Sequence, residues 1–556
     1  MKKRLILAAY IFLFWILLPG LIVTFALWID ELAGFRTIRG VISGILVLCL
    51  ALPLLTLSII QFRNFSGKYP VSADPPAIFI RTGLYAVWRH PIYLFYTLTL
   101  IGVALLWGSG GMLLVSIPAF IALEAVYTIA EEKILVRRFG DSYRNYRKIT
   151  PLIIPRFYFW MKIPCFLLFR ALFSFKVSGK EHIPDSPPFF LVSAHRNYLD
   201  PFYLAQALPY PIRYITTFEM FRSGKIRWFF RALDCIPKKR YLHDVSTGRQ
   251  VLKAIRQEAV IGVFPEGERI WTGTLKGLKP ETLNLFKKFS SIPILPVRLQ
   301  GNFFAWPRWG KGSRRAHVKV EFLEPIKIEK EWDMDKIRER IEAAIDPDDL
   351  NHPDFYCKSH RCIDDICKVI YRCPLCRTFE GISLHGEKGK CNHCGGRIDM
   401  DERYKLTCRN EKEHVEGSMD EMYKNIRVTV GELEKLSEGS FPGVLERMCR
   451  DGEQIVAYSE EVQLSAESFS KMKILLTGPL MLTGQRIAIT QENEIRSVPL
   501  KSISSVTTES NYKLQVYDGR RKQLYQMVFG RESVLKWQDL IAAVMEKEHA
   551  LHPNLR

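Results

Sequence analysis

Residues 189–200 read FFLVSAHRNYLD, and this stretch decides the fold of the middle of the chain. Its apolar start predicts a buried β-strand. The strand ends at a polar turn that contains His195 and Asp200, and Pro201 then suits the first turn of a helix over Phe202–Ala207. A strand, a polar turn and a helix in this order are typical of an α/β sheet, in which ligands bind beyond the carboxyl ends of the strands.

Three further segments predict strands of the same sheet, because each is short and mostly apolar. The first runs directly into Pro265–Arg269, a loop with two carboxylates, a glycine and an arginine. Since the carboxyl ends of parallel strands meet at one edge of a sheet, this loop is expected to lie beside the turn that holds His195. The three predicted strands are Ile261–Phe264, Ile292–Leu299 and His317–Phe322.

His195 and Asp200 can act together on a proton. A neutral imidazole takes a proton from an attacking hydroxyl when a carboxylate holds its other nitrogen in the right tautomer, which is worth about 10²–10⁴-fold in rate. No serine or cysteine nucleophile is needed if an acyl group passes directly from donor to acceptor. In the second loop, Glu266, Gly267 and Arg269 can grip a polar acceptor that carries a phosphate. A histidine and an aspartate at this spacing also fit a purely structural role.

Four sequence blocks occur in an order that matches a known family. They are HRNYLD at 195–200, LDCIPKKR at 233–240, FPEGER at 264–269 and IPILPV at 292–297. Through these blocks, the chain from about residue 175 to 345 resembles the glycerolipid acyltransferase family typified by 1-acylglycerol-3-phosphate acyltransferase. The resemblance implies transfer of a fatty acyl group from acyl-CoA or acyl-carrier protein to a lysophospholipid, in phospholipid biosynthesis.

The resemblance also implies roles for particular residues. His195 would be the general base and Asp200 its orienting partner. Asn197 and Glu268 depart from the family's usual serine and threonine or serine, and Phe289 stands where glycine is usual. Glu268 adds a negative charge beside the expected phosphate site. The residues expected to bind the acceptor are Arg240, Glu266, Gly267 and Arg269.

The N-terminal quarter of the chain is predicted to cross a membrane about four times. It contains three uncharged runs, each long enough for the ~20 residues that span a hydrocarbon core. The third run is broken by Trp107–Gly111, which predicts a turn between two spans. The first run is too long for a signal peptide and lacks a small-residue cleavage site, so a retained anchor is favoured. The runs are Leu5–Ile29, Gly40–Phe62 and Pro91–Leu123.

The basic residues around these runs predict the orientation of the chain. They gather before the first span, after the second and after the fourth, so the positive-inside rule places both termini and all large polar segments in the cytoplasm. Residues 157–176 mix aromatic and aliphatic side chains around Pro164 and predict a helix at the membrane surface rather than a fifth span. We therefore expect an integral protein of the cytoplasmic or inner membrane, with its catalytic and C-terminal domains on the cytoplasmic side.

Two polar clusters flank the last two spans. One is RHPIY at 89–93, and the other contains Glu131 and Glu132. Charged groups at the ends of membrane helices either face a cavity, where they can hold an amino-acid derivative, or anchor the helix among the headgroups.

Residues 67–155 resemble the isoprenylcysteine carboxyl methyltransferase family, which includes related phospholipid methyltransferases. The matching features are Gly67, Asp74-Pro75-Pro76, the RHPIY string, the Glu pair, FGDSYRNY at 139–146 and Pro151. Phe95 stands where a small residue usually follows the RHPIY string, which narrows the expected cofactor pocket. The resemblance implies an S-adenosylmethionine site that involves His90, Tyr93, Glu131 and Glu132.

The chain is strongly basic, with 78 lysines and arginines against 58 aspartates and glutamates and a formal net charge of +20. Such an excess favours contact with an anionic membrane surface or with nucleic acid. Basic residues between Arg213 and Arg240 are interleaved with aromatic ones such as Trp228. A membrane-facing patch that guides an anionic lysolipid is favoured over a solvated face and over base stacking, and no nucleic-acid partner is expected.

Eight of the twelve cysteines lie between residues 357 and 408. Cytoplasmic cysteines are expected to be thiols or metal ligands. Two C-x2-C pairs in this region predict a structural zinc ribbon, because four thiolates close a tetrahedral site and leave no position for catalysis. A second site formed by Cys357, His360, Cys362, Cys367 and Cys408 is left open. The predicted zinc ligands are Cys373, Cys376, Cys391 and Cys394.

After a linker at Ser437–Gly443, the sequence predicts a small β domain. Asp518-Gly519 joins two alternating segments and is a hairpin signal. Several strands followed by one helix resemble the pleckstrin-homology-like folds, for which a protein or a lipid headgroup is the expected partner. The predicted elements are strands at Ile474–Leu476, Arg486–Thr490, Lys513–Tyr517 and Gln523–Phe529, and a helix at Arg531–Lys547.

These features predict a multidomain membrane-bound acyltransferase. Two alternatives stay open: the principal activity is methylation of a lipid or lipidated substrate, or the chain recruits a partner to the membrane without catalysis. The predicted domains are a transmembrane methyltransferase-like domain (1–156), an acyltransferase domain with a leading interfacial helix (157–345), a zinc-ribbon region (346–436) and a pleckstrin-homology-like β domain (437–556).

Overall fold

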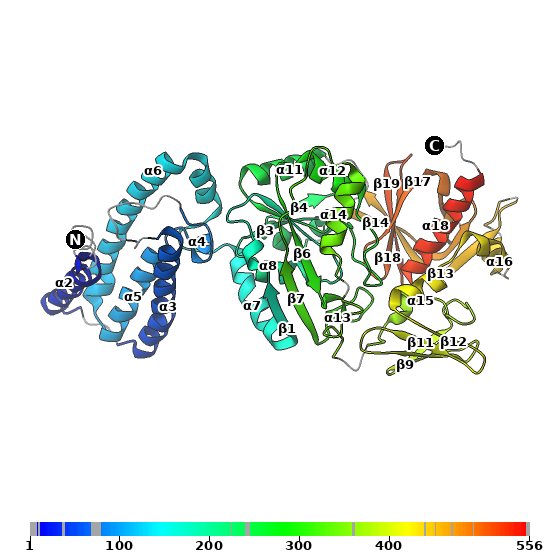
Figure 1. The fold of residues 1–556 in the computed structure, drawn as a ribbon, viewed down its shortest axis with the longest axis horizontal. Coiled ribbons are helices and arrows are strands. Elements are labelled where there is room, and N and C mark those ends of the chain that lie inside the picture. Colours follow the sequence, from blue (N-terminus) through cyan, green and yellow to red (C-terminus); the bar gives the residue numbers. More distant parts are fainter. Residues whose placement is uncertain are drawn as a thin grey trace.

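The computed structural model has three parts side by side: N-terminal helices, a central α/β part and a C-terminal part built on antiparallel sheets (Figure 1). It describes the chain except residues 1–7, 9–11, 36–38, 68–69, 71–78, 223, 240–244, 348, 359–361, 439–440, 447, 451, 469–470, 493 and 552–556. Some predictions lie outside the described residues. They concern Arg240, Asp74–Pro76, His360, and parts of the first apolar run and of the linker at 437–443.

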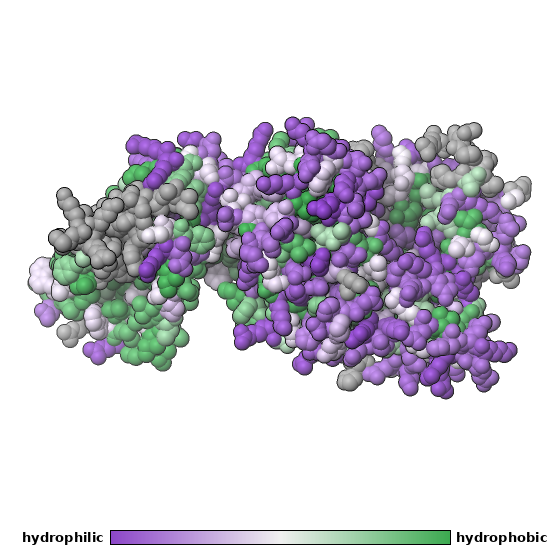
Figure 2. Space-filling model, viewed as in Figure 1, coloured by the Kyte–Doolittle hydropathy of each residue, from purple (hydrophilic) through white to green (hydrophobic). Residues whose placement is uncertain are grey.

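Apolar helices build the N-terminal part. They are α2 (Leu18–Ala33), α3 (Val41–Ser66), α4 (Leu84–Val87), α5 (Pro91–Trp107) and α6 (Ile117–Ile149), with short π-helical turns before α2 and α6. Helices α3 and α5 pack closely at small residues, since a Cβ added to Gly44 would lie 2.9 Å from the carbonyl oxygen of Gly102. Hydrophobic side chains cover much of the outer surface of this part (Figure 2).

The prediction of about four spans is confirmed in part. Within the described residues, α3 and the continuous helix Met112–Ile149 are long and apolar enough to cross a membrane, whereas α5 is apolar but shorter. The predicted turn at Trp107–Gly111 is present, because α5 ends at Trp107 with Gly108 as its left-handed C-cap, and the π-helical turn begins at Met112.

Helix α7 (Phe157–Leu172) leads into the central part. It buries Tyr158 and Phe169, while Leu167 and other apolar side chains on the same helix are exposed. The predicted helix over residues 157–176 is therefore too long at its end. The chain changes to strand β1 (Phe173–Ser178) there, because it gains backbone hydrogen bonds at the edge of the central sheet.

A seven-stranded sheet forms the centre of the molecule, in the order β1-β7-β6-β2-β5-β3-β4. Neighbouring strands are parallel except for β6 and β7. The four predicted strands are confirmed, with ends shifted by one or two residues. The strands after β1 are β2 (Phe189–Ser193), β3 (Ile212–Thr217), β4 (Ile236–Lys238), β5 (Val260–Val263), β6 (Ile294–Gln300) and β7 (Ala316–Phe322).

Both faces of this sheet are covered, because alternate residues of β2 pack into two different cores. Phe189 and Leu191 pack on the side of α7 and α8, and Phe190 and Val192 pack on the side of α11, α12 and α14. The helices are α8 (Asp200–Ala207), α9 (Glu219–Arg222), α10 (Arg227–Ala232), α11 (Val245–Arg256), α12 (Pro280–Lys288), α13 (Asn302–Ala305) and α14 (Met334–Ile345).

Two antiparallel sheets follow. The smaller has the order β12-β11-β10-β9-β8, and the larger β16-β15-β14-β13-β19-β18-β17. The first comprises β8 (Ile382–His385), β9 (Lys388–Cys391), β10 (Arg397–Met400), β11 (Leu406–Arg409) and β12 (His414–Gly417). Helices α15 (Met419–Ile426) and α16 (Leu433–Ser437) follow it along the chain, and α16 contacts β13 of the larger sheet. The larger sheet comprises β13 (Ile455–Ser468), β14 (Lys471–Thr483), β15 (Arg486–Gln491), β16 (Glu494–Pro499), β17 (Ile503–Thr508), β18 (Lys513–Asp518) and β19 (Gln523–Phe529). Helix α17 (Gly443–Glu446) precedes it along the chain, and α18 (Val534–Leu551) follows it.

The last helix confirms the predicted amphipathic pattern, with its start three residues later than expected. Val534, Trp537, Ile541 and Val544 are buried, and Trp537 stacks on Phe529 of β19. One continuous hydrophobic core joins the central part to both C-terminal sheets. The larger β part is consequently packed against the rest of the molecule rather than tethered to it.

Candidate active site

Three adjacent strands of the central sheet end at the candidate site. Strand β2 leads to His195, β5 leads to the loop 264–270, and β6 leads to Asn302. Because β5, β2 and β6 are neighbours and parallel, their carboxyl ends meet at one edge of the sheet. The structure thus brings the two predicted loops together, as expected from the sequence.

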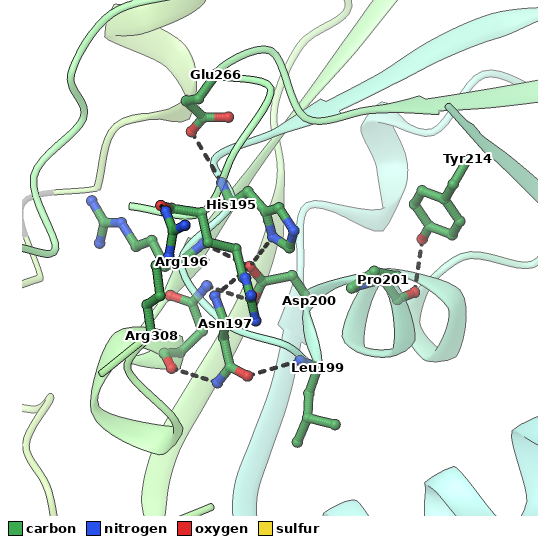
Figure 3. Close-up of polar contacts among 11 residues, drawn as sticks. His195, Arg196, Asn197, Leu199, Asp200, Pro201, Tyr214, Glu266 and Arg308 are labelled. Atoms are coloured by element: carbon green, nitrogen blue, oxygen red, sulfur yellow. Dashed lines mark hydrogen bonds and ion pairs between the residues drawn. The ribbon is translucent and has the colours of Figure 1, made fainter. Parts of the chain in front are cut away.

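Asp200 is a fully buried carboxylate with a donor at each oxygen. Its Oδ2 accepts hydrogen bonds from the backbone N–H groups of Arg196 (2.7 Å) and Asn197 (2.8 Å), and lies 3.0 Å from Nδ1 of His195 (Figure 3). Its Oδ1 accepts a hydrogen bond from Nδ2 of Asn302 at 2.8 Å. These bonds replace the water that the carboxylate loses, so it can be buried as an anion in one orientation.

The His195 ring is held ready to accept a proton. Since Nδ1 faces the Asp200 anion, Nδ1 carries the hydrogen and Nε2 is the free acceptor. The ring also stacks on Phe264, with centroids 4.2 Å apart. Burial lowers the pKa of His195 below its ordinary value, although the bond to Asp200 opposes this effect. The imidazole is therefore neutral at pH 7, which is the state a general base needs.

The loop after β5 clamps the backbone of His195 from both sides. Oε1 of Glu266 accepts a hydrogen bond from the N–H of His195 at 3.0 Å, and the N–H of Ile270 donates to the carbonyl oxygen of His195 at 2.8 Å. Gly267 makes the turn between them with a φ of 73°. Burial raises the pKa of Glu266 to about 8, so this carboxyl group is protonated at neutral pH.

The two charged residues at the end of this loop point to different neighbours. The guanidinium of Arg269 lies 3.3 Å from the ring centroid of Tyr198, which lies in the same turn as His195. Oε2 of Glu268 lies 3.4 Å from Nη1 of Arg308 and accepts a hydrogen bond from the Thr508 hydroxyl. The negative charge expected beside the phosphate site is thus balanced by a buried arginine.

Sequence reasoning missed three residues of this site. Asn302 lies two residues after the end of strand β6, so a polar residue after a third predicted strand was an available signal. Arg196 is buried and paired with Asp349 at 2.5 Å, and Arg308 is buried beside Trp271. Neither arginine carried a sequence signal, because its partners lie far away along the chain.

The predicted S-adenosylmethionine residues also come together, where the start of α5 meets the middle of α6. The Tyr93 hydroxyl donates to Oε2 of Glu131 at 2.8 Å, and Nδ1 of His90 lies 3.6 Å from the same oxygen. Nε2 of His90 lies 3.5 Å from Oε1 of Glu132, which also accepts a hydrogen bond from Arg89 at 2.6 Å.

This cluster fits the charged ends of an amino-acid derivative. It offers two carboxylates for an ammonium group and an arginine for a carboxylate. The Nε atom of Arg89 is buried without a hydrogen-bond partner among the described residues, so a donor is available there. Phe95, which was expected to narrow the pocket, packs edge-on against Trp88 with centroids 5.1 Å apart.

Four cysteines come together beside the smaller sheet, one at the end of β9 and three in the neighbouring connections. Their sulfur atoms all lie within 4.8 Å of one another, with Cys373 and Cys394 at 3.8 Å and Cys376 and Cys391 at 3.7 Å. Sulfur atoms about 2.3 Å from a tetrahedral metal ion lie about 3.8 Å apart, so the spacing fits. Among the described residues no second group of this kind is found, and His360 lies outside them.

The basic and aromatic segment that begins at Arg213 is only partly exposed to solvent. Arg213 donates to Gln257 at 2.6 Å, and Arg222 pairs with Glu467 of the C-terminal part. Both arginine side chains are largely buried, whereas Trp228 is exposed. The predicted membrane-facing patch therefore does not include these two arginines.

Comparison with known proteins agrees with this geometry. Residues 174–300 match the family described as Acyltransferase, and residues 40–142 match the family described as Phospholipid methyltransferase. The chain contains an acyltransferase domain. A phospholipid methyltransferase-like domain precedes it.

The relatives of the acyltransferase domain are distant. The 1-acyl-sn-glycerol-3-phosphate acyltransferase of Bacillus subtilis is 27% identical over 153 residues, which cover 27% of this chain and 73% of the relative. The alpha enzyme of that name from Ovis aries is 26% identical over 177 residues, covering 31% of this chain and 61% of the relative. The chain therefore spans less than two thirds of this mammalian relative.

A solved structure is similar to part of the chain. It is the 1-acyl-sn-glycerophosphate (LPA) acyltransferase PlsC from Thermotoga maritima, with 20% sequence identity and a TM-score of 0.31. The similarity covers 41% of this chain and 90% of the other.

Proposed function

We propose that the protein is a membrane-bound O-acyltransferase that transfers a fatty acyl group from acyl-CoA or acyl-carrier protein to the free hydroxyl of a lysophospholipid. The proposed acceptor is 1-acylglycerol-3-phosphate, the substrate class named for the Bacillus and sheep relatives. The proposed role is in phospholipid biosynthesis.

The pair His195–Asp200 carries this proposal. Nε2 of His195 takes the proton of the acceptor hydroxyl as the hydroxyl oxygen attacks the thioester carbonyl carbon. Asp200 holds Nδ1–H and stabilises the imidazolium that forms. When the carbon–sulfur bond breaks, the imidazolium returns the proton to the departing thiolate. The products are the new ester and a free thiol, and no covalent enzyme intermediate is required.

We assign binding of the acceptor phosphate to the loop beside His195 and to the residues that follow β4 in the sequence. We assign its binding to Glu266, Gly267, Arg269 and Arg240, as the family resemblance implies. Glu266 suits this place because its protonated form does not repel a phosphate. The cation of Arg269 supplies the attraction.

The apolar helices support a proposal for the membrane arrangement. We propose that α3, the helix Met112–Ile149 and further N-terminal helices anchor the chain in the cytoplasmic or inner membrane. The exposed apolar side chains of α7 suit the bilayer surface, where a lysophospholipid is available. The acyltransferase and C-terminal domains then lie on the cytoplasmic side, in keeping with the basic segments around the spans.

The C-terminal regions complete the proposal. We assign a structural zinc ion to Cys373, Cys376, Cys391 and Cys394, and a pleckstrin-homology-like fold to the larger sheet with its terminal helix. This places the domain boundaries near residues 156, 345 and 436, and leaves a protein or a lipid headgroup as the partner of the last domain.

The test is acyl transfer by the detergent-solubilised protein. A panel of lysophospholipids is offered with acyl-CoA and with acyl-carrier protein, and products are read by mass spectrometry. The wild type should form a diacyl product that His195→Ala loses, whereas His182→Ala, a control in the same domain, should keep it. Absence of product from the wild type with every acceptor and donor would refute the proposal.

The methyltransferase-like domain supports a second activity. The family match and the cluster of His90, Tyr93, Glu131 and Glu132 favour S-adenosylmethionine, which supplies an electrophilic methyl group when bound. We propose that the carboxylates hold its ammonium group and that Arg89 holds its carboxylate. Calorimetric titration of the wild type and Glu132→Gln with S-adenosylmethionine tests this assignment, and binding by the wild type alone is expected.

A further inference from the structure

The loop that clamps His195 is joined to the C-terminal β domain through a buried arginine. Arg308 follows helix α13, and its side chain is 1% exposed. Its Nη1 donates to the carbonyl oxygen of Arg269 at 2.6 Å, inside the clamping loop. Its Nη2 donates to the carbonyl oxygen of Thr508 at 2.8 Å and to the Thr508 hydroxyl at 2.7 Å.

Thr508 closes a ring of three side chains. It is the last residue of β17 and is fully buried. Its hydroxyl accepts a hydrogen bond from Arg308 and donates one to Oε2 of Glu268 at 3.1 Å, while Glu268 and Arg308 form an ion pair. A hydroxyl serves this place because it is a donor and an acceptor at once, which a valine of similar shape is not.

The hydrogen-bonded set of Thr508, Glu268 and Arg308 affects His195 through the loop that it holds in place. Residues 264–270 stack Phe264 on the His195 ring, bond Glu266 to the His195 N–H and bond Ile270 to the His195 carbonyl oxygen. The loop turns at Gly267, a residue that restricts the backbone little. The position of the loop therefore depends on contacts outside it. Arg308 and Thr508 provide such contacts, because they bond to Glu268 and Arg269, which lie between Glu266 and Ile270.

The β domain is held firmly enough to serve as this support. A second contact joins it to the acyltransferase domain, where Arg222 of α9 pairs with Glu467 of β13 and donates to Sδ of Met472 at 3.4 Å. One continuous hydrophobic core also runs through both domains.

We propose that Thr508 of the C-terminal domain is a positioning residue for acyl transfer, acting through Arg308 and Glu268 on the loop that holds His195. The inference rests on the proposed function. It also accounts for Glu268 in place of the family's threonine or serine, because the longer side chain reaches both Arg308 and Thr508. The β domain is then a built-in part of the acyltransferase site.

The test compares three variants of the full-length protein. Thr508→Val removes the hydroxyl and keeps the shape, and Thr508→Ser restores the hydroxyl. Thr490→Val is the matched control: it removes a buried hydroxyl of the same sheet, on β15, whose hydrogen-bond partner among the described residues is the carbonyl oxygen of Glu494. The measurements are kcat and KM for the acyl donor, and hydrogen exchange of the peptide that covers residues 264–270.

We expect Thr508→Val to lower kcat about tenfold with little change in KM. The reason is that the variant loses the hydrogen bonds to the charged groups of Arg308 and Glu268, which hold the loop beside His195. Exchange of residues 264–270 should become faster in this variant, and Thr508→Ser and Thr490→Val should behave as the wild type. Unchanged kcat and unchanged exchange in Thr508→Val would overturn the inference, as would an equal loss in Thr490→Val. If the wild type forms no diacyl product, the proposed function fails, and the exchange measurement still decides whether Thr508 holds the loop.

Discussion

At the scale of single residues, the decisive feature is a carboxylate whose oxygens all face hydrogen-bond donors. Asp200 meets the N–H groups of Arg196 and Asn197, the His195 ring and the amide of Asn302. Asp200→Asn must turn an NH2 group toward one of these donors. We expect kcat for acyl transfer to fall about 10²–10⁴-fold, because the His195 tautomer is no longer fixed. Steady-state assays check this, and near-normal kcat would contradict the role given to Asp200.

The pH dependence of acyl transfer should report His195. Its pKa lies below the ordinary 6.5, since burial disfavours the imidazolium more than Asp200 favours it. The base is therefore competent above this pKa, and kcat/KM should fall as the pH drops through it. The profile from pH 4.5 to 7.5, about the range in which histidines titrate, checks this expectation. An acid limb above pH 6.5 would contradict it.

Glu266 should make the stability of the folded protein fall as the pH rises, whereas His195 makes the activity rise with pH. Its pKa is raised to about 8, so the folded protein holds a proton that the unfolded chain releases at about pH 4.3. The contribution of this proton to stability is full below about pH 4 and is lost as the pH rises through 8. Glu266→Gln mimics the protonated form and should remove this loss.

We expect Glu266→Gln to keep most of the activity at pH 7, because its amide oxygen can accept the same bond from the His195 N–H. Glu266→Ala leaves that N–H without its acceptor and should be impaired. Denaturant unfolding at pH 6 and 9, together with acyl-transfer assays, checks both variants. Equal loss of activity in the two variants would show that Glu266 acts as an anion.

At the scale of elements, we expect the smaller antiparallel sheet to depend on the four cysteines clustered beside it. If they bind zinc, the purified protein should contain about one zinc ion per chain. Cys391→Ser should lose the metal and make the segment around residues 373–409 sensitive to protease, because the short strands of this sheet have little core of their own. Metal analysis and limited proteolysis check this. Cys449→Ser, a control outside the sheet, should keep the zinc, and metal-free wild-type protein would refute the assignment.

The elements that the sequence predicted well are those with a strong local pattern. The buried strands, the hairpin at Asp518-Gly519 and the final amphipathic helix all carry such patterns. The predicted end of the helix at residue 176 was wrong, because residues 173–176 are apolar enough for a helix. They form part of strand β1 only because they pair with β7. That pairing partner lies far along the chain, so no local pattern revealed it.

At the scale of the whole molecule, two candidate active sites share one chain. Glu258 of the acyltransferase domain pairs with Arg81 and accepts a hydrogen bond from Ser142 at 3.0 Å, which joins the two domains. The two sites share no residue. We therefore expect His195→Ala to keep S-adenosylmethionine binding and Glu132→Gln to keep acyl transfer. Calorimetry and acyl-transfer assays on both variants check this, and loss of both properties in either variant would contradict independent sites.

The sequence alone indicated where the candidate sites lie along the chain, because strand ends, metal-ligand spacing and apolar runs are local patterns with direct physical meaning. From it we predicted that His195, Asp200 and the loop at 264–269 meet at one sheet edge and that four cysteines come together, and the structure has both arrangements. Only the tertiary structure decided what surrounds them. Asn302, Arg308 and Thr508 reach the site from distant segments, and burial, which sets the protonation of His195 and Glu266, exists only once the domains have packed together.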